Sequence, residues 1–245
     1  MTAAGIVAQP GAAAGAPPVA VHPGGAPTVA AVPAAAAVLD AAEPLVWSFI
    51  GDSVTAASWH TWGGRGHAEL FHERLREIGR TRDGVIDTAV SGWRVGDLAE
   101  QLDVVCLRYS PDVVVIGTGL NDTKGGADGV AEFGRTYRDV VARLRDAGAL
   151  VVVQTPNGSL PTSPVHVLDH VDAYAAEIRA IAEELDLVLV DHLAVWEATP
   201  TDTTFHWLGH GCHPNAYGHR AMARTLIETF GIWDPESRTG RLTLP

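Results

Sequence analysis

Four short segments of the sequence carry residues suited to acyl-transfer chemistry. The first is Gly51-Asp52-Ser53, where a serine directly follows a hydrophobic run; a surface turn alone would explain the glycine and the aspartate but not the serine. The others place Gly92 in SGW, Asn121 in GTGLND and His213 in CHPN. A hydroxyl, an imidazole and amide donors together can provide a nucleophile, a general base and an oxyanion hole.

These segments can act together only if the fold brings them to one place. Short apolar runs alternate with amphipathic stretches, which predicts buried parallel strands joined by helices. The predicted strands are Leu45–Ile50, Val85–Val90, Asp112–Gly117, Leu150–Thr155 and Leu187–Val190. The predicted helices are His67–Gly79, Gly96–Cys106, Asp128–Ala147, Val167–Leu185 and Asn215–Phe230, the last with Asn215 as its N-cap and His219 on its solvated side.

This order predicts an α/β protein with a three-layer α/β/α, flavodoxin-like fold and a five-stranded parallel sheet. In such folds the functional groups lie at the carboxyl ends of the strands. The first three segments follow the first three predicted strands, and the His213 segment follows the fifth. All four are therefore expected at one rim of the sheet.

With the four blocks in this order, residues 45 to 230 resemble the SGNH or GDSL-type hydrolases, a family named for a Ser, a Gly, an Asn and a His. The resemblance implies that Ser53 is the nucleophile and His213 its base. It also implies an oxyanion hole built from the backbone N–H groups of Ser53 and Gly92 and the side chain of Asn121. No metal or organic cofactor is implied, and the partner is a small-molecule ester or acyl substrate.

The sequence departs from the family pattern at His210, where members usually carry an aspartate three residues before the catalytic histidine. In one interpretation Asp202 or Glu197 replaces that aspartate, or a Ser–His dyad suffices. In a second, His206, His210 and His213 bind a metal, although the glycines and proline around them argue against helical ligand geometry. In a third, the site is degenerate and binds a carbohydrate or ester without turning it over.

Several residues near the blocks are candidates for contacting substrate or orienting the site. Trp59 and Trp62 follow the serine in the Gly-rich segment SWHTWGGRG, and we expect them to form a lid or a pocket wall. Arg94, beside Gly92, is a candidate for binding a carboxylate or phosphate on the substrate. Asp52, next to the serine, is a further candidate for orienting the site.

Composition restricts the remaining possibilities. The formal net charge is −12, with 29 acidic against 17 basic residues, which argues against a nucleic-acid partner. Cys106 and Cys212 are too few for a disulfide framework. The leading interpretation is a serine esterase or lipase; an acyltransferase of the same mechanism and a non-catalytic binding module are the alternatives. The residues do not indicate the acyl group, the alcohol or the oligomeric state.

The chain is expected to comprise three parts. Residues 1–42 are rich in Ala, Pro and Gly and are predicted to be a disordered leader, 43–233 the hydrolase-like domain, and 234–245 a C-terminal tail. The leader lacks the basic region and unbroken apolar run of a signal peptide, so the prediction is a cytoplasmic protein, with secretion left open if the true start lies upstream. No stretch is apolar for long enough to predict a membrane span.

Overall fold

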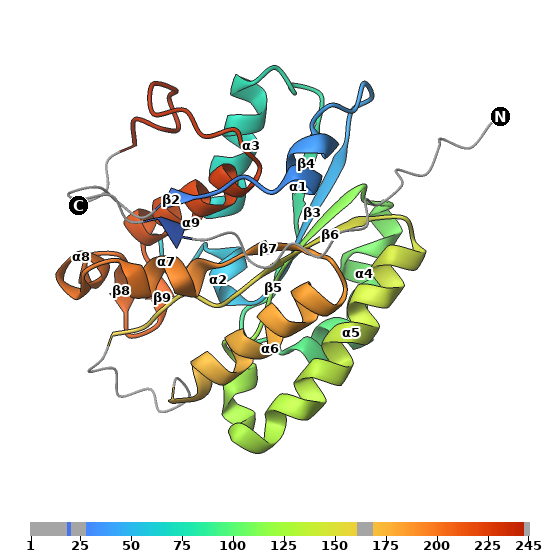
Figure 1. Ribbon diagram of the computed structural model, residues 1–245, viewed down its shortest axis with the longest axis vertical. Coiled ribbons are helices and arrows are strands. Elements are labelled where there is room, and N and C mark those ends of the chain that lie inside the picture. The colour runs from blue at the N-terminus through green and yellow to red at the C-terminus, as the bar shows by residue number, and fades with distance from the viewer. Residues whose placement is uncertain (1–18, 21–27, 161–168, 243–245) are drawn as a thin grey trace.

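A computed structural model describes residues 19–20, 28–160 and 169–242. Its centre is a five-stranded sheet in the order β4-β3-β5-β6-β7, and every neighbouring pair of strands is parallel (Figure 1). The strands are β3 (Val46–Gly51), β4 (Gly84–Asp87), β5 (Val113–Gly117), β6 (Leu150–Gln154) and β7 (Val188–Val190). In chain order this is 2-1-3-4-5, the flavodoxin-like order, so the predicted fold is confirmed.

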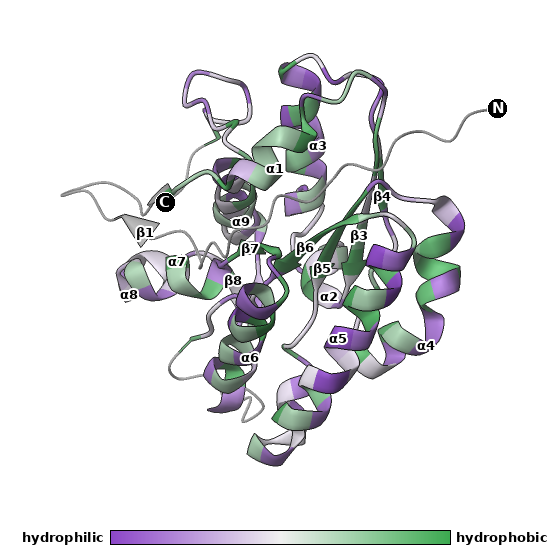
Figure 2. Ribbon diagram, turned by 45° about the vertical axis from the view of Figure 1, so that its right-hand side comes forward, coloured by the Kyte–Doolittle hydropathy of each residue, from purple (hydrophilic) through white to green (hydrophobic). Residues whose placement is uncertain are grey.

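Alternation along the strands divides the core into two layers. Trp47 and Phe49 face one side of the sheet, and Ile50 faces the other. Helices α4 (Val95–Val105), α5 (Val130–Asp146) and α6 (Val171–Glu184) cover the Ile50 side, whereas α3 (His67–Glu77) and α9 (Ala216–Thr229) cover the Trp47 side. Figure 2 shows the strands largely hydrophobic and the outer helices banded with hydrophilic residues.

The predicted elements agree with the observed ones to within a few residues at each end. One expectation is wrong for β4: this strand at the edge of the sheet is half-buried or exposed along its length, not buried. The predicted start of α6, before residue 169, lies outside the described residues. Asn215 caps α9 as expected, accepting from the N–H groups of Tyr217 and Gly218 at 2.8 and 3.2 Å.

Shorter elements complete the described chain. They are the strand pair β1 (Val19–Ala20) and β2 (Thr28–Val29), the helices α1 (Pro33–Val38), α2 (Ser53–Ala56), α7 (His192–Ala198) and α8 (Thr201–Phe205), and the antiparallel pair β8 (Leu208–His210) and β9 (His213–Pro214). Single 3-10 turns lie at Leu107–Tyr109, Asp122–Gly125 and Ala127–Gly129.

Helix α1 lies inside the segment predicted to be disordered, so that prediction is wrong for this stretch. Ala35 is fully buried in the core layer of Trp47, and the Val32 N–H donates to the Thr229 carbonyl at 2.8 Å. Pro33 suits the first helical position, and the alanines after it favour helix while allowing close packing. Residues 1–18 and 21–27 lie outside the described part of the chain.

Near the C-terminus, the segment after α9 packs back on the domain. The Thr239 N–H donates to Glu77 at 3.0 Å, and Leu242 contacts the core. Within the described residues no helix is both long and apolar enough to cross a membrane.

Candidate active site

Ser53 lies where β3 passes into α2, at the carboxyl edge of the sheet. It is the first residue of α2 and is 8% exposed. Gly51 runs so close to Gly117 of the neighbouring strand that a β-carbon at position 51 would clash with the Gly117 carbonyl oxygen. Asp52 accepts the Val54 N–H at 2.9 Å and so caps the short helix. The turn therefore presents the serine hydroxyl above the strand end.

Asp52 is buried, and burial raises the pKa of its carboxyl to about 7, with the nearby charge of Asp122 adding to the rise. Its carboxylate contacts the backbone of its own turn and not His213. Asp52 also lines a small hollow beneath the turn together with Thr118, Gln154 and His192. Its observed role is to shape the turn that carries Ser53.

The Ser53 hydroxyl lies 2.8 Å from Nε2 of His213, although the two residues are 160 positions apart in the chain. His213 begins β9 and is half-buried. Burial, with smaller contributions from the neighbouring His60 and His210, lowers the pKa of its imidazole to about 4. The ring is therefore neutral near pH 7 and can accept a proton from Ser53.

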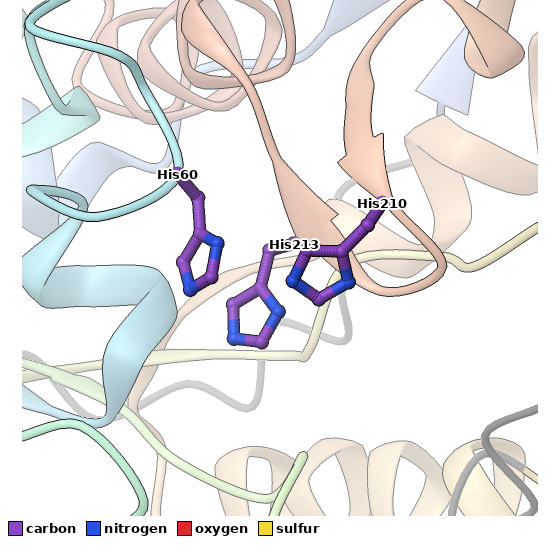
Figure 3. A group of neighbouring side chains, drawn as sticks. All are labelled: His60, His210 and His213. Carbon is purple, nitrogen blue, oxygen red and sulfur yellow. The ribbon is translucent and has the colours of Figure 1, made fainter.

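Three side chains besides Ser53 contact the His213 ring. Cys212 Sγ lies 3.4 Å from Nδ1. The His60 ring stacks on the His213 ring at 3.7 Å between centroids, and the His210 ring lies 4.6 Å from it (Figure 3). Among the described residues no carboxylate contacts this imidazole.

The carboxylates and the histidine expected near His213 lie elsewhere. Asp202 is exposed in α8 and accepts the neighbouring Thr203 N–H at 2.8 Å, and Glu197 is exposed on α7. The prediction that one of them replaces the missing aspartate is therefore wrong. The side chain of His206 is exposed against Phe205, outside the group formed by His60, His210 and His213, so the alternative in which His206, His210 and His213 bind one metal does not match the structure.

Asn157 holds the His213 segment in place, and the sequence argument did not identify it. Its Nδ2 donates to the Cys212 carbonyl at 3.0 Å and to the Gly158 carbonyl at 2.7 Å. A signal was present, because Asn157 follows the fourth strand just as the other blocks follow theirs. His60 also belongs to the site, and no local sequence signal links it to His213.

Asn121 and Gly92 lie on two adjoining loops after β5 and β4. The Asn121 Nδ2 donates to the Trp93 carbonyl at 3.1 Å, which ties its loop to the segment that contains Gly92. Gly92 is exposed and has φ +87°, a backbone conformation that favours glycine.

Asp122 reinforces this connection between the loops. Its two carboxylate oxygens accept the N–H groups of Val95 at 3.0 Å and Gly119 at 3.1 Å. Burial raises the pKa of Asp122 to about 6, opposed by these hydrogen bonds and by the charge of Arg94. Arg94 itself is exposed at the start of α4.

Trp59 and Trp62 are 79% and 87% exposed on the loop after α2, so they are not part of the core. Between them, His60 points inward to stack on His213. The loop thus contacts the site through its histidine and presents both indoles to solvent.

The arrangement contains a hydroxyl hydrogen-bonded to a neutral imidazole at the carboxyl end of a parallel sheet, with amide donors on adjoining loops. Such a group can carry out acyl transfer through a covalent serine ester.

Comparison with known proteins agrees with this chemistry. Residues 49–221 match the GDSL-like lipase/acylhydrolase family. The chain is also 29% identical over 140 residues to the uncharacterized esterase YxiM of Bacillus subtilis (strain 168), a match covering 52% of this chain and 36% of that protein. It thus spans about a third of the length of that curated relative.

Solved structures share the fold at lower identity. An acetylxylan esterase of Geobacillus stearothermophilus, Axe2, is 23% identical with a TM-score of 0.63, covering 76% of this chain and 94% of that one. A GDSL-like lipase of Parabacteroides merdae is 20% identical with a TM-score of 0.67, covering 80% and 99%. Because the family match extends over most of the chain, from β3 into α9, the protein belongs to the GDSL-like lipase/acylhydrolase family.

Proposed function

We propose that this protein is a serine ester hydrolase in which Ser53 and His213 act as a catalytic dyad. The observation that carries the proposal is the 2.8 Å contact between the Ser53 hydroxyl and His213 Nε2. His213 takes the Ser53 proton as the oxygen attacks the ester carbonyl, then gives that proton to the departing alcohol. Water, deprotonated by His213, next attacks the acyl-serine and releases the acid.

The oxyanion formed in each step needs hydrogen-bond donors close to Ser53. We assign this role to the Ser53 N–H, the Gly92 N–H and the second N–H of the Asn121 amide. The first N–H of Asn121 is already used by the Trp93 carbonyl, and that contact fixes the plane of the amide.

For Nε2 to accept the serine proton, the neutral ring must carry its own proton on Nδ1. That N–H points to Cys212 Sγ at 3.4 Å, and sulfur is a weak acceptor. The stacked His60 ring supplies the remaining restraint. This support lacks the negative charge that stabilises an imidazolium, so we expect a slower enzyme than a complete triad would give.

Two other functions use the same residues. An acyltransferase would pass the acyl group from Ser53 to an alcohol rather than to water, and water access to the site separates the two reactions. A binding module would keep the pocket without turnover. A fluorophosphonate probe distinguishes the binder, because only an activated serine attacks it, and an added alcohol acceptor distinguishes the transferase through the ester it forms.

The test measures fluorophosphonate labelling and hydrolysis of p-nitrophenyl acetate, longer p-nitrophenyl esters and acetylated xylo-oligosaccharides. Ser53→Ala and His213→Ala should each lower kcat by about a thousandfold or more, while the exposed Ser58→Ala serves as a matched control and retains activity. Equal labelling of wild type and Ser53→Ala would overturn the proposal. Labelling of Ser53 with no turnover of any ester would favour transfer to another acceptor.

A further inference from the structure

Three histidine rings lie together over the proposed active site, and the dyad mechanism uses only one of them. Ligand nitrogens of His60, His210 and His213 all lie within 4.8 Å of one another (Figure 3). They come from two separate parts of the fold, the loop after α2 and the β8–β9 hairpin. Within that hairpin His210 and His213 are paired across the two strands, so the backbone itself places both rings side by side.

We propose that His60, His210 and His213 form a Zn²⁺ site, and that zinc bound there switches off the Ser53–His213 dyad. Three imidazoles with an open fourth position are a common zinc ligand set, and imidazole suits Zn²⁺ among the divalent metals. The inhibitory half of this proposal rests on the proposed function; the metal site does not.

The three rings need one ring rotation and a short approach of their nitrogens to close around an ion. Zinc–nitrogen bonds of about 2.0–2.1 Å in a tetrahedral site place ligand nitrogens about 3.4 Å apart, so the widest pair must approach by roughly 1.4 Å. The metal must also lie in each ring plane, so His60 has to rotate out of its stack on His213. His60 is half-buried, on a loop that continues through Gly63 and Gly64, and His210 is exposed.

Access and charge favour a cation at this position. His210 is open to solvent, and His60 and His213 are partly so. The cluster contains no cationic side chain, and the chain carries a net charge of −12, which raises the local concentration of cations.

Zinc ligation and general-base action at His213 exclude each other whichever nitrogen is used. If Nε2 donates its lone pair to the metal, no lone pair is left to accept the Ser53 proton. If Nδ1 is the ligand, the ring proton moves to Nε2, which then donates to Ser53 instead of accepting from it. In both cases the serine keeps its proton and loses nucleophilicity. Removal of zinc restores the base.

The test follows binding and serine reactivity separately in the full-length protein, stripped with EDTA. Isothermal titration with Zn²⁺ and the visible absorption of Co²⁺ measure the site without reference to activity. We expect one ion per chain, and a fall of at least tenfold in the rate of fluorophosphonate labelling of Ser53 at saturating zinc, reversed by EDTA. Ser53→Ala should bind zinc as wild type does, because the hydroxyl is not a ligand.

Variants assign the ligands. Zinc binding should weaken by at least tenfold in each of four variants: His60→Ala, His60→Gln, His210→Ala and His210→Gln. Circular dichroism checks that each variant folds. His206→Ala is the matched control, since His206 is an exposed histidine of the same segment outside the cluster, and it should bind zinc normally. Absence of saturable binding, or unchanged binding in the His60 and His210 variants, would overturn the site. Faster hydrolysis with zinc would overturn the inhibitory role and indicate a metal-activated nucleophile instead.

If the stripped protein fails to label while zinc still binds, the proposed function fails and the metal site stands. If the stripped protein labels normally but binds no zinc, the metal site fails and the proposed function stands.

Discussion

His210 stands three residues before His213, at the position where the family resemblance leads us to expect an aspartate. Its ring lies 4.6 Å from that of His213, close enough to show that a side chain at position 210 can reach the imidazole. What a histidine cannot supply is a negative charge to stabilise the imidazolium formed during catalysis. In the proposed dyad, His213 therefore has only the weak support of Cys212 and His60.

Restoring the carboxylate tests this view. His210→Asp should raise kcat for p-nitrophenyl acetate by tenfold or more, because the charge stabilises the protonated base in the transition state. His210→Asn is the control, since it can orient the ring but has no charge. Equal kcat values for the two variants would show that orientation, not charge, limits the wild-type enzyme.

The loops after β4 and β5 form the element on which the proposed oxyanion hole depends. Asp122 joins them by accepting backbone N–H groups from Val95 and Gly119. Without it, two N–H groups in a largely buried position lose their partners, at a cost of about 1–3 kcal/mol each. The loop carrying Asn121 would also lose its fixed relation to Gly92.

Asp122→Ala should therefore lower the free energy of unfolding by roughly 2 kcal/mol or more and reduce kcat at least tenfold. Urea denaturation and ester hydrolysis measure the two effects. Asp122→Asn keeps one acceptor oxygen, so its free energy of unfolding and its kcat should lie between those of Asp122→Ala and wild type. Full activity in Asp122→Ala would mean that these loops do not set the rate.

Helix α9 begins directly after the His213 strand, so its N-cap affects both stability and the site. Asn215 caps the helix and also donates to the His206 carbonyl at 2.9 Å. Asn215→Ala should cost about 0.5–2 kcal/mol in urea denaturation, whereas Asn215→Asp retains the cap and should cost less. If the alanine and aspartate variants are equally destabilised, the contact with His206 outweighs the cap.

At the scale of the whole molecule, a second group of histidines lies buried between the helices and the sheet. His67 of α3, His192 of α7 and His219 of α9 are almost fully buried, and the His67 and His219 rings stack at 5.5 Å. Burial lowers the pKa of His67 to about 4, opposed by the nearby Gln154 side chain, and it lowers those of His192 and His219 well below the usual value. Each ring is therefore neutral in the folded protein near pH 7.

As pH falls, the three histidines gain protons in the unfolded chain before they do so in the folded protein. Their contribution to the free energy of unfolding is therefore complete above about pH 6.5 and is lost toward pH 4. Two carboxyls act in the opposite direction, since the pKa of Asp52 is raised to about 7 and that of Asp122 to about 6. The net pH profile of the wild type alone therefore does not isolate the histidines.

A variant isolates the contribution of His67. The free-energy advantage of wild type over His67→Gln should shrink by about 3 kcal/mol between pH 7.5 and 4, at about 1.4 kcal/mol per pKa unit. Urea denaturation at both pH values measures it, and the carboxyls cancel in the comparison. A constant difference would show that His67 keeps an ordinary pKa in the folded protein.

Local sequence patterns suffice to predict the alternating strands and helices, the parallel sheet and the segments at its carboxyl edge. These features depend on local patterns: apolar runs, helical spacing and a cap such as Asn215 are written in neighbouring residues. The four blocks and the family resemblance likewise predict that Ser53 pairs with His213, and the two side chains lie 2.8 Å apart.

The surroundings of His213, by contrast, depend on packing between segments that are far apart in the sequence. Asp202 was the nearer candidate in sequence, yet His60, more than a hundred positions away, is the residue that stacks on the ring. His219 was expected in solvent and is 1% exposed, because α9 turns that side toward His67. Helix α1 likewise forms where composition predicted disorder, because α9 and the core offer it a surface. Contacts between distant segments arise from packing, and packing is not encoded in any local pattern.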